Sequence, residues 1–159
     1  MQDLLITTQT FGFHLTALDI RQHSRLHEET IEELFSLGNV MEGYTKLSEQ
    51  EKIDILVNAL YNPRRLSRFK SERSAVASKV MSVFEEIRDI ITLDSDAFGS
   101  YIISMTHGVS DMLEVLIIAK ELGLWSIING KVTTSLDVVP LFETIEDLGA
   151  SSKIMSEMF

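Results

Sequence analysis

The chain of 159 residues is long enough for one domain with a substantial apolar core, and its net charge of −10 argues against a nucleic-acid partner. It contains no cysteine, which excludes disulfides, thiolate metal sites and a cysteine nucleophile. No stretch approaches the roughly 18 consecutive apolar residues of a membrane span, and the N-terminus lacks the layout of a signal peptide, so we expect a soluble, cytoplasmic protein without a membrane partner.

The first informative stretch is Phe11–His27, which reads FGFHLTALDIRQHSRLH. Apolar and polar residues alternate over Phe13–Ala17, which predicts a strand that ends on Asp19-Ile20-Arg21, and Ser24 is a candidate cap for a following helix. An arginine at the end of a strand can present its planar guanidinium group to a phosphate or a carboxylate. On spacing alone, a surface ion pair between Asp19 and Arg21 is the preferred interpretation.

Three helices are expected next. The first runs from Ser24 to Gly38, and the second begins at the capping box Ser48–Glu51 and ends at Asn62-Pro63. The basic cluster from Arg64 to Arg73 indicates a solvated loop and helix start more than a binding site. The third helix is expected over Glu72–Ile91, with the apolar stripe Val76, Val80, Val83, Ile87 and Ile90.

A loop over Thr92–Gly99 precedes the apolar run Tyr101–Met105, which is typical of a strand buried in a parallel sheet. Ser110-Asp111 is interpreted as the cap of the next helix, which ends at Gly123, and not as a nucleophile pair. The remaining elements are a polar turn at Asn129-Gly130, a third strand over Leu136–Phe142, and two short helical pieces at Ile145–Leu148 and Ser152–Phe159.

This succession of strands and helices predicts a mostly helical α/β fold with about three parallel strands, as in a segment of a TIM-type (β/α) barrel. Three polar side chains, Arg21, His107 and Glu143, are expected just after the strand ends. In a (β/α) barrel the active site forms at that edge of the sheet, so position and chemistry point to the same place.

Three stretches together resemble the phosphoenolpyruvate carboxylase family. The first stretch resembles FGFxLxxLDIRQ(H/E)S, the stretch Tyr101–Glu121 resembles YxISMxxxxSDxLxVxxLxKE, and Val138–Leu148 contains the string PLFETxxDL. Each string alone is weak, but three in order with comparable spacing are specific. Arg64-Arg65-Leu66 is similar to an Arg-Pro-Leu string of the family, with Arg65 in place of the proline.

The resemblance implies an enzyme that joins phosphoenolpyruvate to bicarbonate, giving oxaloacetate and phosphate, with Mg²⁺ or Mn²⁺ as cofactor. It makes Arg21 a catalytic ligand of the substrate phosphate and Glu143 a carboxylate ligand of the metal. Both roles are chemically sound, because a guanidinium group can neutralise a phosphoryl group and a hard cation prefers oxygen ligands.

Gln22, His27 and His107 are candidates for indirect support of this site, and polar packing is the alternative for each histidine. A zinc site made from His107 and Glu143 is a further possibility, but the sequence separation of the two residues is not specific to a zinc site. Asp147 is a poor substitute for a second metal ligand, since in a helical segment its side chain should point along the helix.

Other stretches of the family are absent from the chain: a TAHPTE-like stretch with a catalytic histidine, a YSDSxKD-like stretch with the second carboxylate ligand, and a GRGG loop. We therefore expect residues 1–159 to be a single segment of a larger catalytic domain, inactive alone, whose full-length parent is a homo-oligomer, a tetramer in the family. The alternative is an independent small α/β binding or interaction domain. A regulatory module for a dicarboxylate effector has no sequence feature of its own.

Overall fold

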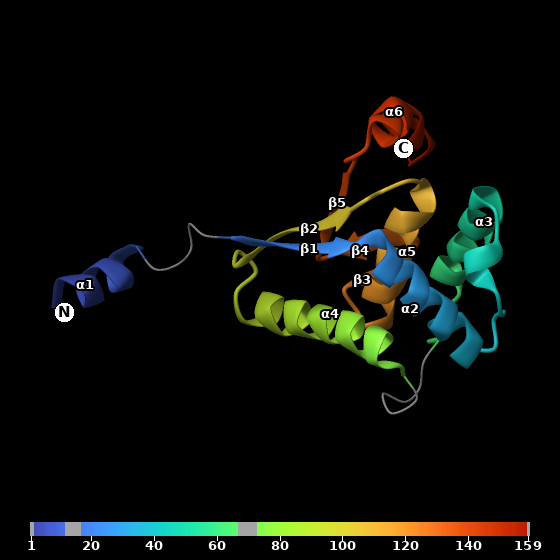
Figure 1. Cartoon of the computed structure of the whole chain (residues 1–159). Coiled ribbons are helices and arrows are strands. Elements are labelled where there is room, and N and C mark those ends of the chain that lie inside the picture. The colour runs from blue at the N-terminus through green and yellow to red at the C-terminus, as the bar shows by residue number, and fades with distance from the viewer. Residues whose placement is uncertain (1, 12–16, 67–72, 159) are drawn as a thin grey trace.

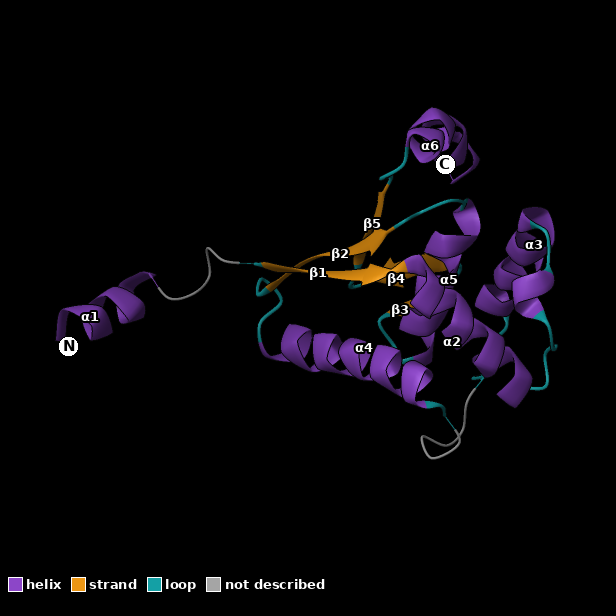
Figure 2. Cartoon of the chain, viewed as in Figure 1, coloured by secondary structure: helices purple, strands orange, loops and turns teal. Residues whose placement is uncertain are grey.

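The computed structural model describes residues 2–11, 17–66 and 73–158, and Figure 1 traces the chain through them. Helices dominate and strands form two small sheets (Figure 2). The elements, in chain order, are α1 (Gln2–Phe11), β1 (Leu18–His23), α2 (Ser24–Leu37), a short 3₁₀ turn η1 (Tyr44–Lys46), α3 (Glu49–Tyr61), α4 (Ala75–Leu93), β2 (Phe98–Ser104), α5 (Val109–Glu121), β3 (Trp125–Ile128), β4 (Lys131–Thr134), β5 (Asp137–Leu141) and α6 (Ile145–Met158).

The main sheet confirms the predicted α/β class, because its three strands are parallel and lie in the order β1-β2-β5. Its register places Arg21 beside Ile102, and Ile102 beside Val139. Each parallel connection needs a crossover, which α2, α3 and α4 supply between β1 and β2 and α5 supplies before β5. The order of strands and helices is therefore the one expected for consecutive units of a (β/α) fold.

The two faces of this sheet differ in their surroundings. Tyr101 and Ile103 are fully buried, and Ile20 and Val138, which flank Tyr101 in the register, pack partly buried against the same core. Side chains alternate between faces along a strand, so Arg21 lies on the opposite face. That face is less covered, since Val139, which lies two strands away in the same row of the register, is 40% exposed. The helix-covered face thus holds the core and the other face presents Arg21.

Several helix boundaries are confirmed. The capping box at Ser48 forms, with Glu51 Oε2 accepting from the Ser48 N–H at 2.8 Å, and α3 ends at Tyr61 with Asn62 as its C-cap before the proline. α2 ends at Leu37 with the predicted Gly38 as its C-cap. Buried apolar side chains of α2, α3, α4 and α5 form one core with those of η1 and β2, and its largest fully buried residues include Phe35, Tyr44, Phe84 and Tyr101.

The first strand and its helix cap differ from the prediction. Part of the predicted strand, residues 13–16, lies outside the described residues, and β1 runs on to His23, so that Arg21 is inside the strand and not after its end. Pairing with β2 continues through this polar stretch because alternating side chains leave the backbone ladder intact. The cap of α2 is His23, whose Nδ1 accepts from the Arg25 N–H at 3.1 Å, and not Ser24.

The third predicted helix has the right type, but its buried face is only partly the predicted one. α4 begins after the cap Ser74 and extends to Leu93, and the strand after it already begins at Phe98. Val76 and Ile90 of the predicted stripe are 38% and 41% exposed. Val80 and Ile87 of the stripe are buried as predicted, and the other buried residues of α4 are Ala77, Met81 and Phe84. A helix that is apolar over more than one stripe does not specify its buried face, so packing against α2 and the sheet decides it.

Two further differences lie near the C-terminus. The turn at Asn129-Gly130 joins β3 and β4 into an antiparallel hairpin, with positive φ at both residues, and Asn-Gly between β-forming residues is a hairpin signal that the prediction did not use. The two predicted helical pieces form one helix, α6, which runs through Gly149. None of the helices in the described ranges is long and apolar enough to cross a membrane.

The N-terminus of α5 is capped from inside and from outside the helix. Asp111 Oδ2 accepts from the N–H groups of His107 and Gly108 at 2.7 and 3.1 Å, which confirms its predicted capping role. Glu49 of α3 accepts from the N–H and the hydroxyl of Ser110, at 2.9 and 2.7 Å. The cap residue itself is Gly108, where an added Cβ would lie 2.3 Å from Glu49 Oε1.

Gly108→Ala should therefore lower the free energy of unfolding by about 1–2 kcal/mol, because Glu49 must withdraw from the Ser110 N–H. Gly149→Ala is the matched control: nothing lies within 4 Å of its added Cβ, so it should raise stability by roughly 0.5–1 kcal/mol, as alanine does in a helix. Urea denaturation at low protein concentration measures both. A Gly108→Ala variant as stable as the wild type would show that the Glu49 cap contributes nothing.

Candidate functional site

Arg21 and Glu143 lie in direct contact at the carboxyl edge of the main sheet. Arg21 comes from β1, and Glu143 follows the end of β5 by two residues. Arg21 Nη2 donates a hydrogen bond to Glu143 Oε1, and the two side chains remain 53% and 31% exposed. The two site residues expected from the sequence, which are 122 positions apart, are thus brought together as an ion pair that solvent can reach.

The backbone of Met105 completes the surroundings of the Glu143 carboxylate. Met105 follows β2 directly and has φ +57, a left-handed conformation that is uncommon for residues other than glycine. Its N–H donates to Glu143 Oε2 at 3.0 Å, while its carbonyl accepts from the Ser24 hydroxyl at 2.7 Å. Both oxygens of Glu143 therefore have donors, and the segments that follow β1, β2 and β5 are tied to one another.

His107 and Asp147 form a second link across the same edge. His107 Nδ1 lies 2.7 Å from Asp147 Oδ1, and the aspartate side chain is only 8% exposed. Asp147 also accepts weakly from the Thr144 N–H at 3.4 Å, while its own N–H donates to Thr144 Oγ1 at 3.0 Å. Hydrogen bonds from Thr144 and His107 lower the pKa of Asp147. The expectation that Asp147 points along its helix is wrong, because it turns back to cap α6; the Thr-x-x-Asp spacing was the signal for this.

Gln22 and His27 are joined on the other, helix-covered face of the sheet. The Tyr101 hydroxyl donates to Gln22 Oε1 at 2.9 Å, and it lies 2.8 Å from His27 Nε2, from which it accepts. His27 is fully buried and its Nδ1 has no hydrogen-bond partner. Burial, followed by the charge of His23, lowers the pKa of His27 to about 3, so the ring is neutral at neutral pH. These two residues support β1 from behind and make no hydrogen bond to Arg21 or Glu143 among those of the described residues.

The donors at this edge do not by themselves form a complete metal site. Within residues 2–11, 17–66 and 73–158, no group of three or more histidine, aspartate or glutamate side chains is placed to hold a metal ion. His107 bonds to Asp147 and not to Glu143, which argues against the zinc site considered from the sequence. Glu143 is a single oxygen ligand with a fixed orientation, which suits a hard divalent cation only if other ligands are added.

A polar hollow of about 390 Å³ opens at the same edge, between the first turns of α2, α3 and α5. His23 and His107 line it, next to the strand ends. Its carboxylates are already engaged: Glu28 pairs with Lys52, and Glu49 caps α5. The hollow is large enough for a small phosphorylated molecule, and it adds space beside the segments that carry Arg21 and Glu143.

Comparison with known proteins gives one consistent result. The family model described as phosphoenolpyruvate carboxylase matches residues 1–159. A phosphoenolpyruvate carboxylase of Rhodothermus marinus is 45% identical over 159 residues, which cover 96% of this chain and 17% of that protein. Those of Burkholderia vietnamiensis and Thermosynechococcus vestitus are 40% and 38% identical, covering 98% and 100% of this chain and 16% of each protein. The chain thus spans about a sixth of the length of the curated relatives it matches.

The buried His27 ring predicts a specific loss of stability in acid. Its pKa is about 3 in the folded chain and near 6.5 when unfolded, so below pH 6.5 the unfolded state binds a proton that the folded state does not. The contribution of neutral His27 to the free energy of unfolding is complete above pH 6.5, and it is lost at about 1.4 kcal/mol per pH unit as the pH falls toward 3. His27→Gln, which keeps an N–H for Tyr101, should remove this slope. Urea unfolding at several pH values tests it, and equal slopes in both proteins would contradict it.

Proposed function

The chain belongs to the phosphoenolpyruvate carboxylase family, and on this premise we propose that residues 1–159 are a single segment of the catalytic domain of a carboxy-lyase. The full enzyme joins phosphoenolpyruvate to bicarbonate and releases oxaloacetate and phosphate. The observation that carries the proposal is the contact between Arg21 and Glu143 at the carboxyl edge of the sheet. Each residue lies in a stretch that resembles the family, and the fold brings the two stretches together.

Arg21 is proposed to bind the phosphate group of the substrate. The guanidinium group has five N–H donors in a rigid fork, and the contact to Glu143 uses only one of its nitrogens. β1 fixes the backbone position of Arg21, and because about half of the side chain is exposed, its guanidinium group is accessible to an incoming phosphate. An arginine held this way can neutralise charge on a phosphoryl group during its transfer.

Glu143 is proposed to be a carboxylate ligand of Mg²⁺ or Mn²⁺. Its carboxylate is oriented by the Met105 N–H and by Arg21, and it lies at the edge where the substrate phosphate would sit. A divalent cation bound there would stabilise the enolate oxygen left after phosphoryl transfer. The ligands that complete its shell would come from outside the described residues, since these contain no group of three or more histidine, aspartate or glutamate side chains placed to hold a metal ion.

The ion pair also links the two proposed roles. Without ligands, Arg21 and Glu143 neutralise each other. When Glu143 shares its negative charge with a cation, it competes less for the guanidinium group, and Arg21 becomes a better phosphate ligand. When Arg21 turns toward a phosphate, Glu143 has a free oxygen for a cation. The pair therefore favours joint binding of metal and substrate over binding of either alone.

The parent protein is proposed to close these (β/α) units into a TIM-type barrel. Three adjacent parallel strands in chain order, with helices over one face, are what successive barrel units require. Arg21 and Glu143 would then face the barrel mouth. The tetrameric state of the parent, its cytoplasmic location and the inactivity of the segment alone stay predictions from the family resemblance. The alternative of an independent binding domain, which the clean helix caps would also suit, stays a prediction as well.

Titration of this chain with Mn²⁺ should show no tight one-to-one binding, because a single carboxylate cannot offset the dehydration of the cation. Isothermal titration calorimetry measures this directly, with Glu143→Ala as the matched variant. Tight stoichiometric binding that Glu143→Ala abolishes would show a complete site within the chain, and the proposed sharing of ligands with other parts of the enzyme would be wrong.

In a full-length enzyme that contains this segment, Arg21→Ala should lower kcat/KM for phosphoenolpyruvate by about 100-fold or more, the scale expected for a lost charge-assisted contact at a reacting group. Arg21→Lys should rescue only part of the loss, since lysine keeps the charge but not the fork. Arg88→Ala, which removes an exposed arginine paired with Asp89 on α4, is the control and should change little. Steady-state kinetics that place Arg21→Ala within a few-fold of the control would refute the phosphate role.

A further inference from the structure

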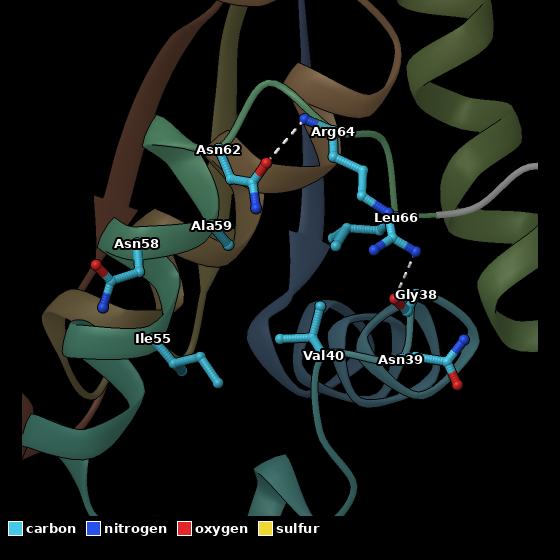
Figure 3. A pocket seen from close by; sticks show the side chains of 9 residues that line it. All are labelled: Gly38, Asn39, Val40, Ile55, Asn58, Ala59, Asn62, Arg64 and Leu66. Atoms are coloured by element: carbon cyan, nitrogen blue, oxygen red, sulfur yellow. Dashed lines mark hydrogen bonds between the residues drawn. The ribbon is translucent and has the colours of Figure 1, made fainter.

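A second cavity lies at the far end of α2 from the Arg21–Glu143 pair. It has a volume of about 280 Å³ and is formed by the C-terminal ends of α2 and α3 and by the chain that follows α3 (Figure 3). α2 begins at Ser24, at the carboxyl edge of the sheet, and its 14 residues span about 21 Å. The cavity is therefore distinct from the site proposed for catalysis.

The walls of this cavity are apolar. Val40, after α2, and Ile55, on α3, extend from opposite sides into the space between the two helices, as Figure 3 shows. Ala59 and Leu66, which are buried, form its deeper part. An occupant would therefore bury an apolar body against these four side chains, which is the usual driving force at a small-molecule site.

One end of the cavity carries fixed hydrogen-bond donors. The Arg64 N–H donates to Asn62 Oδ1 at 3.0 Å, which orients the Asn62 amide and leaves its NH₂ group for another partner. Arg64 Nη2 donates to the Gly38 carbonyl at 3.2 Å, which holds the guanidinium group beside the cavity. None of the described residues that line the cavity is acidic, and no ion pair of Arg64 is found among the described residues.

The helix ends around the cavity limit the charge that an occupant can carry. Two C-terminal helix ends have their carbonyl groups here, and the negative end of a helix dipole disfavours a highly charged anion. These carbonyls already have donors, since Gly38 accepts from Arg64, while Ala59 and Asn62 accept from Lys120 Nζ. The groups left for an occupant are therefore N–H donors with a single positive charge, which fit a monoanion better than a phosphate dianion.

We propose that this cavity binds a small monocarboxylate with a compact apolar body. The carboxylate would accept from Arg64 and the Asn62 amide, and the apolar body would fill the space between Val40 and Ile55. The fork of an arginine matches the two oxygens of a carboxylate. Arg64 is an exposed loop residue, as the sequence predicts for its basic cluster, and the proposal adds a binding role to it. The inference does not rest on the carboxylase activity, because no catalytic residue takes part.

The test uses the ¹³C- and ¹⁵N-labelled chain and 3-methylbutanoate as the probe, followed by NMR titration. Saturable shifts are expected at Arg64 Nε and at the methyl groups of Val40, Ile55 and Leu66. Arg64→Leu should weaken binding at least about tenfold, and so should replacing the probe by its neutral amide, 3-methylbutanamide. Arg65→Leu is the matched control, since Arg65 is the adjacent arginine and does not line this cavity; its affinity should stay within about twofold of the wild type.

Val40→Phe provides a second variant, which fills the cavity without changing a charge. Val40 is 42% exposed, so the fold should tolerate a larger side chain, and binding should be lost while Arg64 remains. Should Arg64→Leu fail to fold, Val40→Phe decides the question. For the wild-type chain, the proposal is overturned if the residues lining the cavity show no saturable shifts up to about 50 mM probe, if the shifts centre on Arg21, or if the acid and the amide bind with equal affinity. For the variants, it is overturned if Arg64→Leu and Arg65→Leu lose the same affinity, or if Val40→Phe binds the probe as well as the wild type.

Discussion

β2 pairs in parallel with both β1 and β5, and the rest of the site depends on this pairing. Parallel strands end at a common edge, so His23, Ser104 and Leu141 lie level in the register. The chain must return to the opposite end of the sheet after each strand, and the helices that make this return cover one face. Residues far apart in sequence, such as Arg21 and Glu143, can therefore meet on the less covered face.

Much of the acidity of the chain is used to satisfy backbone N–H groups. Glu32 accepts from the N–H groups of Gly43 and Thr45, each at 2.8 Å, and these bonds lower its pKa although burial opposes them. Glu121 accepts from the Leu66 N–H, and Glu49 accepts from that of Ser110. A carboxylate is a strong acceptor for N–H groups that have no partner in their own helix or loop. The net charge of −10 is thus partly structural, because several carboxylates hold segments together.

The proposed chemistry follows from how the edge distributes opposite charges. The guanidinium group of Arg21 and the carboxylate of Glu143 lie in contact there, and the Met105 N–H orients the carboxylate. Such a pair suits a reaction in which an anionic substrate and a cation must bind side by side. The hydrogen-bonded group of Gln22, Tyr101 and His27 lies behind β1 and supports it from the covered face.

The sequence by itself determined the class of the fold and most of the elements, and it singled out Arg21 and Glu143, the two residues proposed for the site. Local signals were sufficient there: the capping box at Ser48–Glu51, the apolar run in β2, and the motifs that carry Arg21 and Glu143. Only the tertiary structure decided which face of α4 is buried and how far β1 extends, because both depend on partners distant in sequence. The same holds for the direct Arg21–Glu143 contact and the return of Asp147 to His107. The sequence shows which polar groups each segment carries, whereas tertiary packing decides which of these groups on different strands and loops become hydrogen-bond partners.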